Sequence, residues 1–111
     1  MNLHPSTDIV FVMSTCESIA QAEILTSEIL EARIAACVTS IPGALSTYWW
    51  QGKLEKSQEI VLMIKTVKQN LLKLEQLFQS HHPYELPELV VLPVADGSEQ
   101  YLDWVRMCCG N

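Results

Sequence analysis

The sequence is short of positive charge, of glycine and of long apolar runs. Its 111 residues include 7 Lys and Arg against 13 Asp and Glu, a formal net charge of −6. This sign opposes binding to nucleic-acid phosphates and to anionic lipid. The apolar run at residues 9–13 is too short to span a membrane, and no basic segment precedes it as in a signal peptide. We therefore expect a cytoplasmic protein that binds neither nucleic acid nor membranes.

Familiar catalytic and metal-binding signatures are also missing. The sequence has no G-x-S-x-G, no Walker loop, no H-E-x-x-H and no dinucleotide fingerprint, and its few glycines form no evident phosphate cradle. The four cysteines lack the paired spacing of a structural zinc site, and in a reducing compartment they should remain thiols. The sequence therefore predicts a protein that is not an enzyme and needs no organic cofactor.

The rest of the chain alternates strand-like and helix-like patterns. A chain of this length can bury one core, so we expect a single domain over residues 1–111. Residues 8–13 are typical of a covered strand, and Ser18 with Gln21 forms a capping box for a helix that extends to about Glu31. Residues 35–66 then predict two long strands that turn at Gln51 and Gly52.

The second half of the chain continues the alternation. Residues 68–80 predict a helix that Pro83 stops, and residues 86–94 predict a strand with prolines at its ends. A capping-box pattern from Asp96 to Glu99 opens a last helix. We expect the apolar face of this helix to hold Tyr101, Trp104, Val105 and Cys108. The order β-α-β-β-α-β, followed by α, predicts an α+β protein with the ferredoxin-like fold and an extra C-terminal helix.

The predicted hairpin over residues 35–66 is longer than a domain of this size needs, since strands usually run about five or six residues. Within it, Tyr48 and Trp50 point to one face and Trp49 to the other. Burying all three rings in one chain would require cover on both faces, which a partner subunit could supply. Alternatively, one of the tryptophans simply stays half exposed.

Four segments occur in an order that identifies a resemblance: "ARIAACVTSIPG", "STYWWQGKLEKSQE", "IKT" and "HHPYELPEL". Over residues 9–105 the chain resembles the CutA family of divalent-ion tolerance proteins. The resemblance implies a ferredoxin-like subunit in a homotrimer similar to the PII signalling proteins, with the long hairpin pairing across subunits. It implies much less about molecular activity. One departure is Thr39, where the family often has Asn.

Candidate metal ligands gather where the second predicted helix ends. His81 and His82 could simply complement the negative end of the helix dipole when protonated. Neutral imidazole is also a good ligand for copper, zinc and nickel, and Cys37 could add a soft sulfur if the fold brings it close. Adjacent histidines rarely face one ion, so we expect at most one of them to bind it directly. The ion would then recruit Cys37 or Glu59 across a subunit boundary.

Glu59, Lys65 and Tyr84 are candidates for a ligand cleft. Glu59 and Lys65 share the period-two parity of one strand, so they point to one face about 20 Å apart. Lys65 could anchor an anion or extend to water, and Tyr84 could supply a hydroxyl or pack as a turn aromatic.

Two functions remain open from the sequence. The first is a homotrimeric protein that binds and confers tolerance to divalent metal ions, copper in particular. The second is a PII-like small-molecule sensor or assembly scaffold in which metal binding is adventitious. Fold analogy alone does not decide between them.

Overall fold

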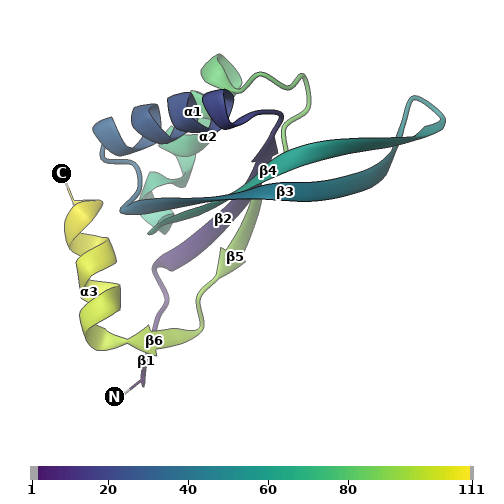
Figure 1. Ribbon diagram of the computed structural model, residues 1–111. Helices are drawn as coiled ribbons and strands as arrows, with labels where there is room; N and C mark the ends of the chain where they lie inside the picture. The colour runs from purple at the N-terminus through teal and green to yellow at the C-terminus, as the bar shows by residue number, and fades with distance from the viewer. Residues whose placement is uncertain (1–2, 111) are drawn as a thin grey trace.

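The computed structural model describes residues 3–110 and contains a four-stranded antiparallel sheet with two helices on one face (Figure 1). The strand order in the sheet is β3-β4-β2-β5, which is the order of the ferredoxin-like fold, so the predicted fold class is confirmed. The elements of this fold are β2 (Ile9–Cys16), α1 (Ile19–Glu31), β3 (Cys37–Trp50), β4 (Lys53–Val67), α2 (Leu71–His81), β5 (Val90–Pro93) and α3 (Glu99–Cys108).

Helix α1 begins where the sequence predicts. The side chain of Ser18 accepts a hydrogen bond from the backbone N–H of Gln21 at 3.2 Å. The side chain of Gln21 accepts in turn from the backbone N–H of Glu17, one residue ahead of the cap. The side chains thus satisfy one free N–H of the first helical turn and the N–H just ahead of the cap, one residue earlier than in a standard capping box.

The core lies between the sheet and the helices α1 and α2. Alternate residues of β2 and β4 point toward these helices and are fully buried, while the residues between them point to the opposite side. We call this opposite side the open face. Helix α3 covers one end of this face over Ile9 and Val67. The apolar residues on the rest of it are half-buried or exposed; they are Phe11, Met13, Ile41, Val61, Met63, Val90 and Leu92.

Strands β3 and β4 are 14 and 15 residues long and extend beyond the helices as a two-stranded ribbon (Figure 1). We call residues 44–59 of this hairpin the arm. A bulge precedes the arm between Ile41 and Ala44, where Gly43 takes a φ of +83°. At the tip Gln51 and Gly52 both have positive φ, as a two-residue hairpin turn requires. The arm stretches the molecule to 46 × 26 × 21 Å. Its pairing across subunits stays a prediction.

The C-terminal region differs from the prediction in two ways. Asp96 does not open the last helix, because it pairs with Pro5 in a short ladder between β1 (Leu3–Pro5) and β6 (Asp96–Ser98). Ser98 is the helix cap instead, and its hydroxyl accepts from the backbone N–H of Tyr101.

The predicted apolar face of α3 is also wrong. Val105 faces the core as predicted, but its buried companions are Leu102 and Cys109, which pack against Ile9 and Val67 at the end of the sheet. The aromatic residues of the predicted face, Tyr101 and Trp104, are exposed. The strand predicted over residues 86–94 is shorter than expected, since its first residues belong to an irregular segment, residues 82–89, that we call the 82–89 loop.

Candidate functional site

The 82–89 loop is fixed to the sheet by His82, which caps α2 and is buried. Its Nδ1 accepts a hydrogen bond from the backbone N–H of Tyr84 at 3.1 Å. The ring proton is therefore on Nε2, which donates to the backbone carbonyl of Thr15 in β2 at 2.9 Å. Burial lowers the pKa of His82 more than the hydrogen bond to Thr15 raises it. The imidazole is thus a neutral group with both nitrogens engaged.

Tyr84 connects the same loop to the base of the arm. Its hydroxyl donates to Oε2 of Glu59 at 2.9 Å. Burial by itself raises the pKa of Glu59, but hydrogen bonds from Ser46, Tyr84 and Thr15 outweigh burial, so the net pKa lies below its usual range. Burial and the Glu59 carboxylate raise the pKa of Tyr84 well above its usual range. At neutral pH the pair is therefore an ionised carboxylate bound by a protonated phenol.

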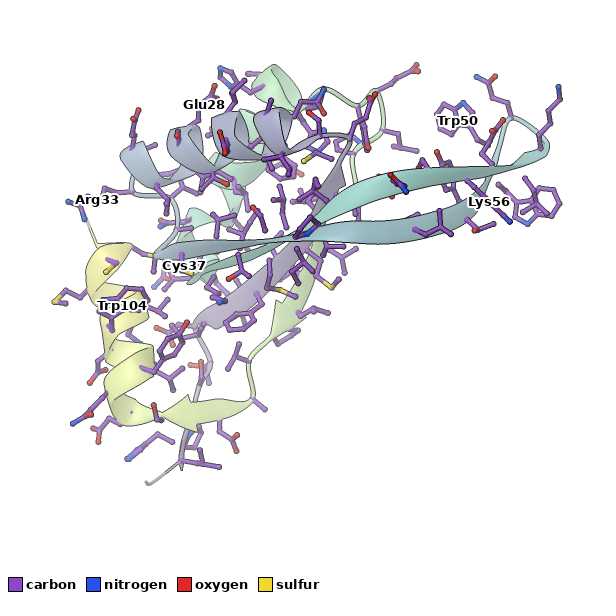
Figure 2. The ribbon with its side chains drawn as sticks, in the orientation of Figure 1. Glu28, Arg33, Cys37, Trp50, Lys56 and Trp104 are labelled. Carbon is purple, nitrogen blue, oxygen red and sulfur yellow. The ribbon has the colours of Figure 1, made fainter. Side chains whose placement is uncertain are left out.

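A cavity of about 300 Å³ lies between the arm and the 82–89 loop. Trp50 lies on the opposite side of the arm from Lys56 (Figure 2), as the strand register requires. The hydroxyl of Tyr48, two residues before Trp50 and on the same face, is 3.3 Å from that of Ser57. The residues that line the cavity are Tyr48, Trp50, Pro83, Tyr84, Glu85 and Leu86.

Lys65 belongs to a different cluster. Its Nζ donates to the hydroxyl of Thr39 at 3.0 Å, lies 3.7 Å from the sulfur of Cys37 and 5.7 Å from the centre of the Phe11 ring. Cys37 is therefore half-buried beside an ammonium group. Lys65 lies six residues along β4 from Glu59, a distance of about 20 Å. Of the three predicted cleft residues, the structure brings Tyr84 and Glu59 together and leaves Lys65 apart.

The predicted metal ligands do not converge within one chain. The two histidines contact different elements: Nδ1 of His81 lies 3.3 Å from Oε2 of Glu28 on α1, whereas His82 is bonded to β2 and to the 82–89 loop. The ammonium of Lys65 beside Cys37 opposes a cation there. In the part of the chain that the structure describes, no group of three or more His, Cys, Asp or Glu side chains could hold a metal ion. A site shared by His81 or His82 with Cys37 stays a prediction for an assembly.

Sequence reasoning missed Glu28 and the partners of Arg106. Glu28 gives no signal, since helix periodicity does not say which residue of α2 it faces. Arg106 makes two hydrogen bonds to the carboxylate of Asp8, at 2.7 and 2.9 Å, and a third to Asp103 at 2.8 Å. The Asp103 contact follows from i,i+3 spacing on a helix, whereas the Asp8 contact depends on the whole fold.

The fold and these sites define a class of protein. It is a ferredoxin-like α+β chain with an extended arm and a small aromatic cavity. The chain belongs to the CutA1 divalent ion tolerance protein family, whose model matches residues 10–108. That family is named for ion tolerance and not for an enzymatic activity. Within residues 3–110, no helix is long and apolar enough to cross a membrane.

Individual relatives agree with this assignment. The divalent-cation tolerance protein CutA of Escherichia coli O45:K1 is 43% identical over 101 residues, which cover 91% of this chain and 90% of the relative. The CutA structure from Synechococcus elongatus PCC7942 superposes with a TM-score of 0.94 at 35% identity, covering 98% of this chain and 96% of that one. A second structure of that protein, complexed with Bis-Tris, gives a TM-score of 0.89 at 34% identity and covers 96% and 99%. The protein from Archaeoglobus fulgidus, described as periplasmic, gives 0.88 at 29% identity and covers 91% and 98%.

Proposed function

We propose that this chain acts in divalent-cation tolerance by binding the ion directly, and that His81 and Glu28 are its first ligands. The observation that carries the proposal is the state of Glu28. Its Oε2 is buried and lies 3.3 Å from Nδ1 of His81, but the contact lacks hydrogen-bond geometry, so the oxygen has no hydrogen-bond partner among the described residues. A buried carboxylate oxygen without a partner favours a cation beside it. Imidazole and carboxylate together suit Cu²⁺ best among the common divalent ions.

The other predicted ligands would join only after a change of partners. His82 would have to release the Tyr84 N–H or the Thr15 carbonyl, and Cys37 would have to lose its ammonium neighbour. We therefore rank them after His81 as ligands. Another subunit would have to supply the remaining ligands of a site that contains them. Their order of importance follows from how many existing contacts each must give up.

Calorimetry of copper binding tests this ranking. We expect His81→Ala and Glu28→Gln to weaken binding strongly, and His82→Ala and Cys37→Ser to weaken it less. His4→Ala is the matched control, since His4 also faces a carboxylate, Glu99, at 3.3 Å. Binding to the wild type should fall as the pH is lowered, because protonated imidazole cannot coordinate. Equal affinity in the wild type and all four site variants would refute a histidine-centred site.

We also propose that the protein is a homotrimer. The open face carries apolar residues that no element within residues 3–110 covers, including Ile41, Val90 and Leu92, all exposed. The sheet has two different free edges, β3 and β5. Joining unlike surfaces head to tail generates a closed ring, and three copies form the trimer that the family resemblance implies. Trp49, 71% exposed on the face of the arm away from the cavity, would then pack against a neighbouring subunit, with Tyr48 and Trp50 at the margin.

A cytoplasmic location is part of the same proposal. All four cysteines are free thiols in the structure, as is usual in a reducing compartment. The relative from Archaeoglobus fulgidus is described as periplasmic, so location can differ among similar proteins. Fractionation of the native host with antibody detection distinguishes the two compartments.

A second candidate function is favoured by the cavity beside Trp50. It is small, is lined by three aromatic side chains and does not include His81 in its lining. The Synechococcus relative has been crystallised with Bis-Tris, an organic molecule. In this alternative the chain senses or carries a small molecule, and metal binding is adventitious. Native mass spectrometry of protein purified without chelator should reveal a bound organic mass if this alternative holds, and a metal mass if the first proposal holds.

A further inference from the structure

We propose that the cavity between the arm and the 82–89 loop binds a small organic ammonium ion, one whose charged nitrogen is covered by alkyl groups. The inference rests on the second candidate function and names the chemical class of its ligand. It does not depend on the cation site at His81 and Glu28.

The shape of the site comes from two elements that are distant in sequence. Tyr48 and Trp50 share one face of β3, because they are two residues apart on the strand. Tyr84 approaches from the 82–89 loop and is held by its hydrogen bond to Glu59. Three aromatic side chains therefore line one cavity, whose volume of about 300 Å³ is at the lower end of the range for small-molecule sites.

The charge around the cavity is negative. Glu85 lines it, and Glu59 lies directly behind the Tyr84 hydroxyl, ionised at neutral pH because its pKa is lowered. Glu55 stands opposite Tyr48 in the strand register and so shares its face. Lys53, opposite Trp50, is the one basic side chain that the register places on this face of the arm, and it is exposed at the tip. The carboxylates thus outnumber the ammonium group.

Aromatic faces combined with carboxylates select for a particular kind of cation. Aromatic rings attract a cation through their quadrupole but cannot replace the water ligands of a small divalent ion. An alkylated ammonium ion is weakly hydrated and presents methyl or methylene groups that pack on the rings. An anion would be repelled by Glu59 and Glu85. The chemistry of the lining therefore favours a quaternary or highly alkylated ammonium ligand.

The test uses choline chloride as the probe and the untagged full-length protein in the presence of EDTA. Saturation-transfer NMR should show contact between the protein and the choline methyl groups. The neutral isostere 3,3-dimethyl-1-butanol, which has the same shape without the charge, should bind at least about tenfold more weakly if the charge is recognised. Equal binding of the two compounds would overturn the proposal, as would the absence of choline binding at millimolar concentration.

Variants locate the binding. Trp50→Leu should weaken choline binding about tenfold, the upper part of the range for a cation–π contact. Trp104→Leu is the matched control, because Trp50 and Trp104 are both 39% exposed but Trp104 lies on α3, which contributes nothing to the cavity. Glu85→Gln, on the surface of the loop, should weaken binding without unfolding the chain. Equal losses in Trp50→Leu and Trp104→Leu would mean that choline binds elsewhere, and would refute the site.

The two proposals fail separately. His81→Ala should retain choline binding, and Trp50→Leu should retain copper binding once EDTA is removed. If choline binds and copper does not, the metal proposal fails and this one stands. If a neighbouring subunit fills the cavity, choline will not bind to the assembled protein, and that result overturns the inference.

Discussion

At the scale of single residues, we expect the burial of His82 to influence how the stability of the protein responds to acid. Because burial lowers the pKa of His82 in the folded chain, the unfolded chain takes up a proton there more readily. Its contribution to the free energy of unfolding is therefore complete above about pH 6.5 and is lost as the pH falls through the lower folded pKa. We expect urea unfolding of His82→Gln to show a weaker loss between about pH 8 and pH 5 than the wild type.

The exposed neighbour His81 supplies the control for that measurement. The side chain of His81 is about half exposed and its Nδ1 lies 3.3 Å from Oε2 of Glu28, so His81→Gln should leave most of the acid sensitivity in place. If His82→Gln and His81→Gln have the same pH profile as the wild type, the buried imidazole does not control acid stability.

A second residue-scale prediction concerns the Tyr84 hydroxyl. Tyr84→Phe removes the donor that binds the ionised, 7% exposed Glu59 carboxylate. Hydrogen bonds to charged groups contribute about 1.5–3 kcal/mol, and the remaining bonds from Ser46 and Thr15 will offset part of the loss, so we expect about 1–2 kcal/mol in urea unfolding. Tyr101→Phe, on the exposed face of α3, should change stability much less. An effect of equal size in both variants would contradict the assigned role.

At the scale of elements, Arg106 holds α3 against the rest of the fold. The hydrogen bonds from Arg106 are the largest cause of the lowered pKa of Asp8, which shows how closely the two groups are coupled. Arg106 is partly exposed, so solvent screens the pair. We expect Asp8→Asn to destabilise the protein by only about 0.5–1 kcal/mol, but to speed hydrogen exchange of the α3 amides in particular. Asp103→Asn, within the helix, should not speed this exchange. If the α3 amides exchange at the same rate in both variants, the pair of Arg106 and Asp8 does not hold α3 in place.

At the scale of the whole molecule, we expect the open face to determine assembly. Sedimentation should show a trimer at low micromolar concentration, and reversible thermal unfolding should shift with protein concentration. Leu92→Lys places a charge on the open face and should dissociate the trimer. Leu72→Lys, on the outside of α2 and 63% exposed, should leave it intact. A folded wild-type monomer under these conditions would disprove the assembly.

Local signals account for most of what could be predicted. Ser18 and Pro83 set the ends of helices through their own backbone chemistry, and strand parity correctly put Glu59 and Lys65 on one face. The sequence did not predict the pairing between β1 and β6, because a strand of three residues is too short to show the two-residue alternation of apolar and polar side chains. The helix cap is Ser98 and not Asp96 for the same reason, because Asp96 is paired with Pro5 in this ladder.

The candidate site was predictable only in part. The composition of the segment around His82 predicts candidate ligands there. The position of the proton on the His82 ring, however, depends on a loop N–H and a carbonyl of β2. Nothing in the sequence spacing says that Tyr84 reaches Glu59 or that Cys37 lies beside Lys65. Such contacts come from how strands and helices stack in three dimensions, where residues distant in sequence meet.

The position of β2 in the sheet has a consequence for synthesis on the ribosome. Its two sheet partners, β4 and β5, are both made after it, and β6 comes later still. The nascent chain must therefore leave both backbone edges of β2 without a strand partner until at least β4 has emerged from the exit tunnel. Each newly made copy thus passes through an interval in which β2 can bind a chaperone or the same strand of a neighbouring nascent chain on one messenger RNA.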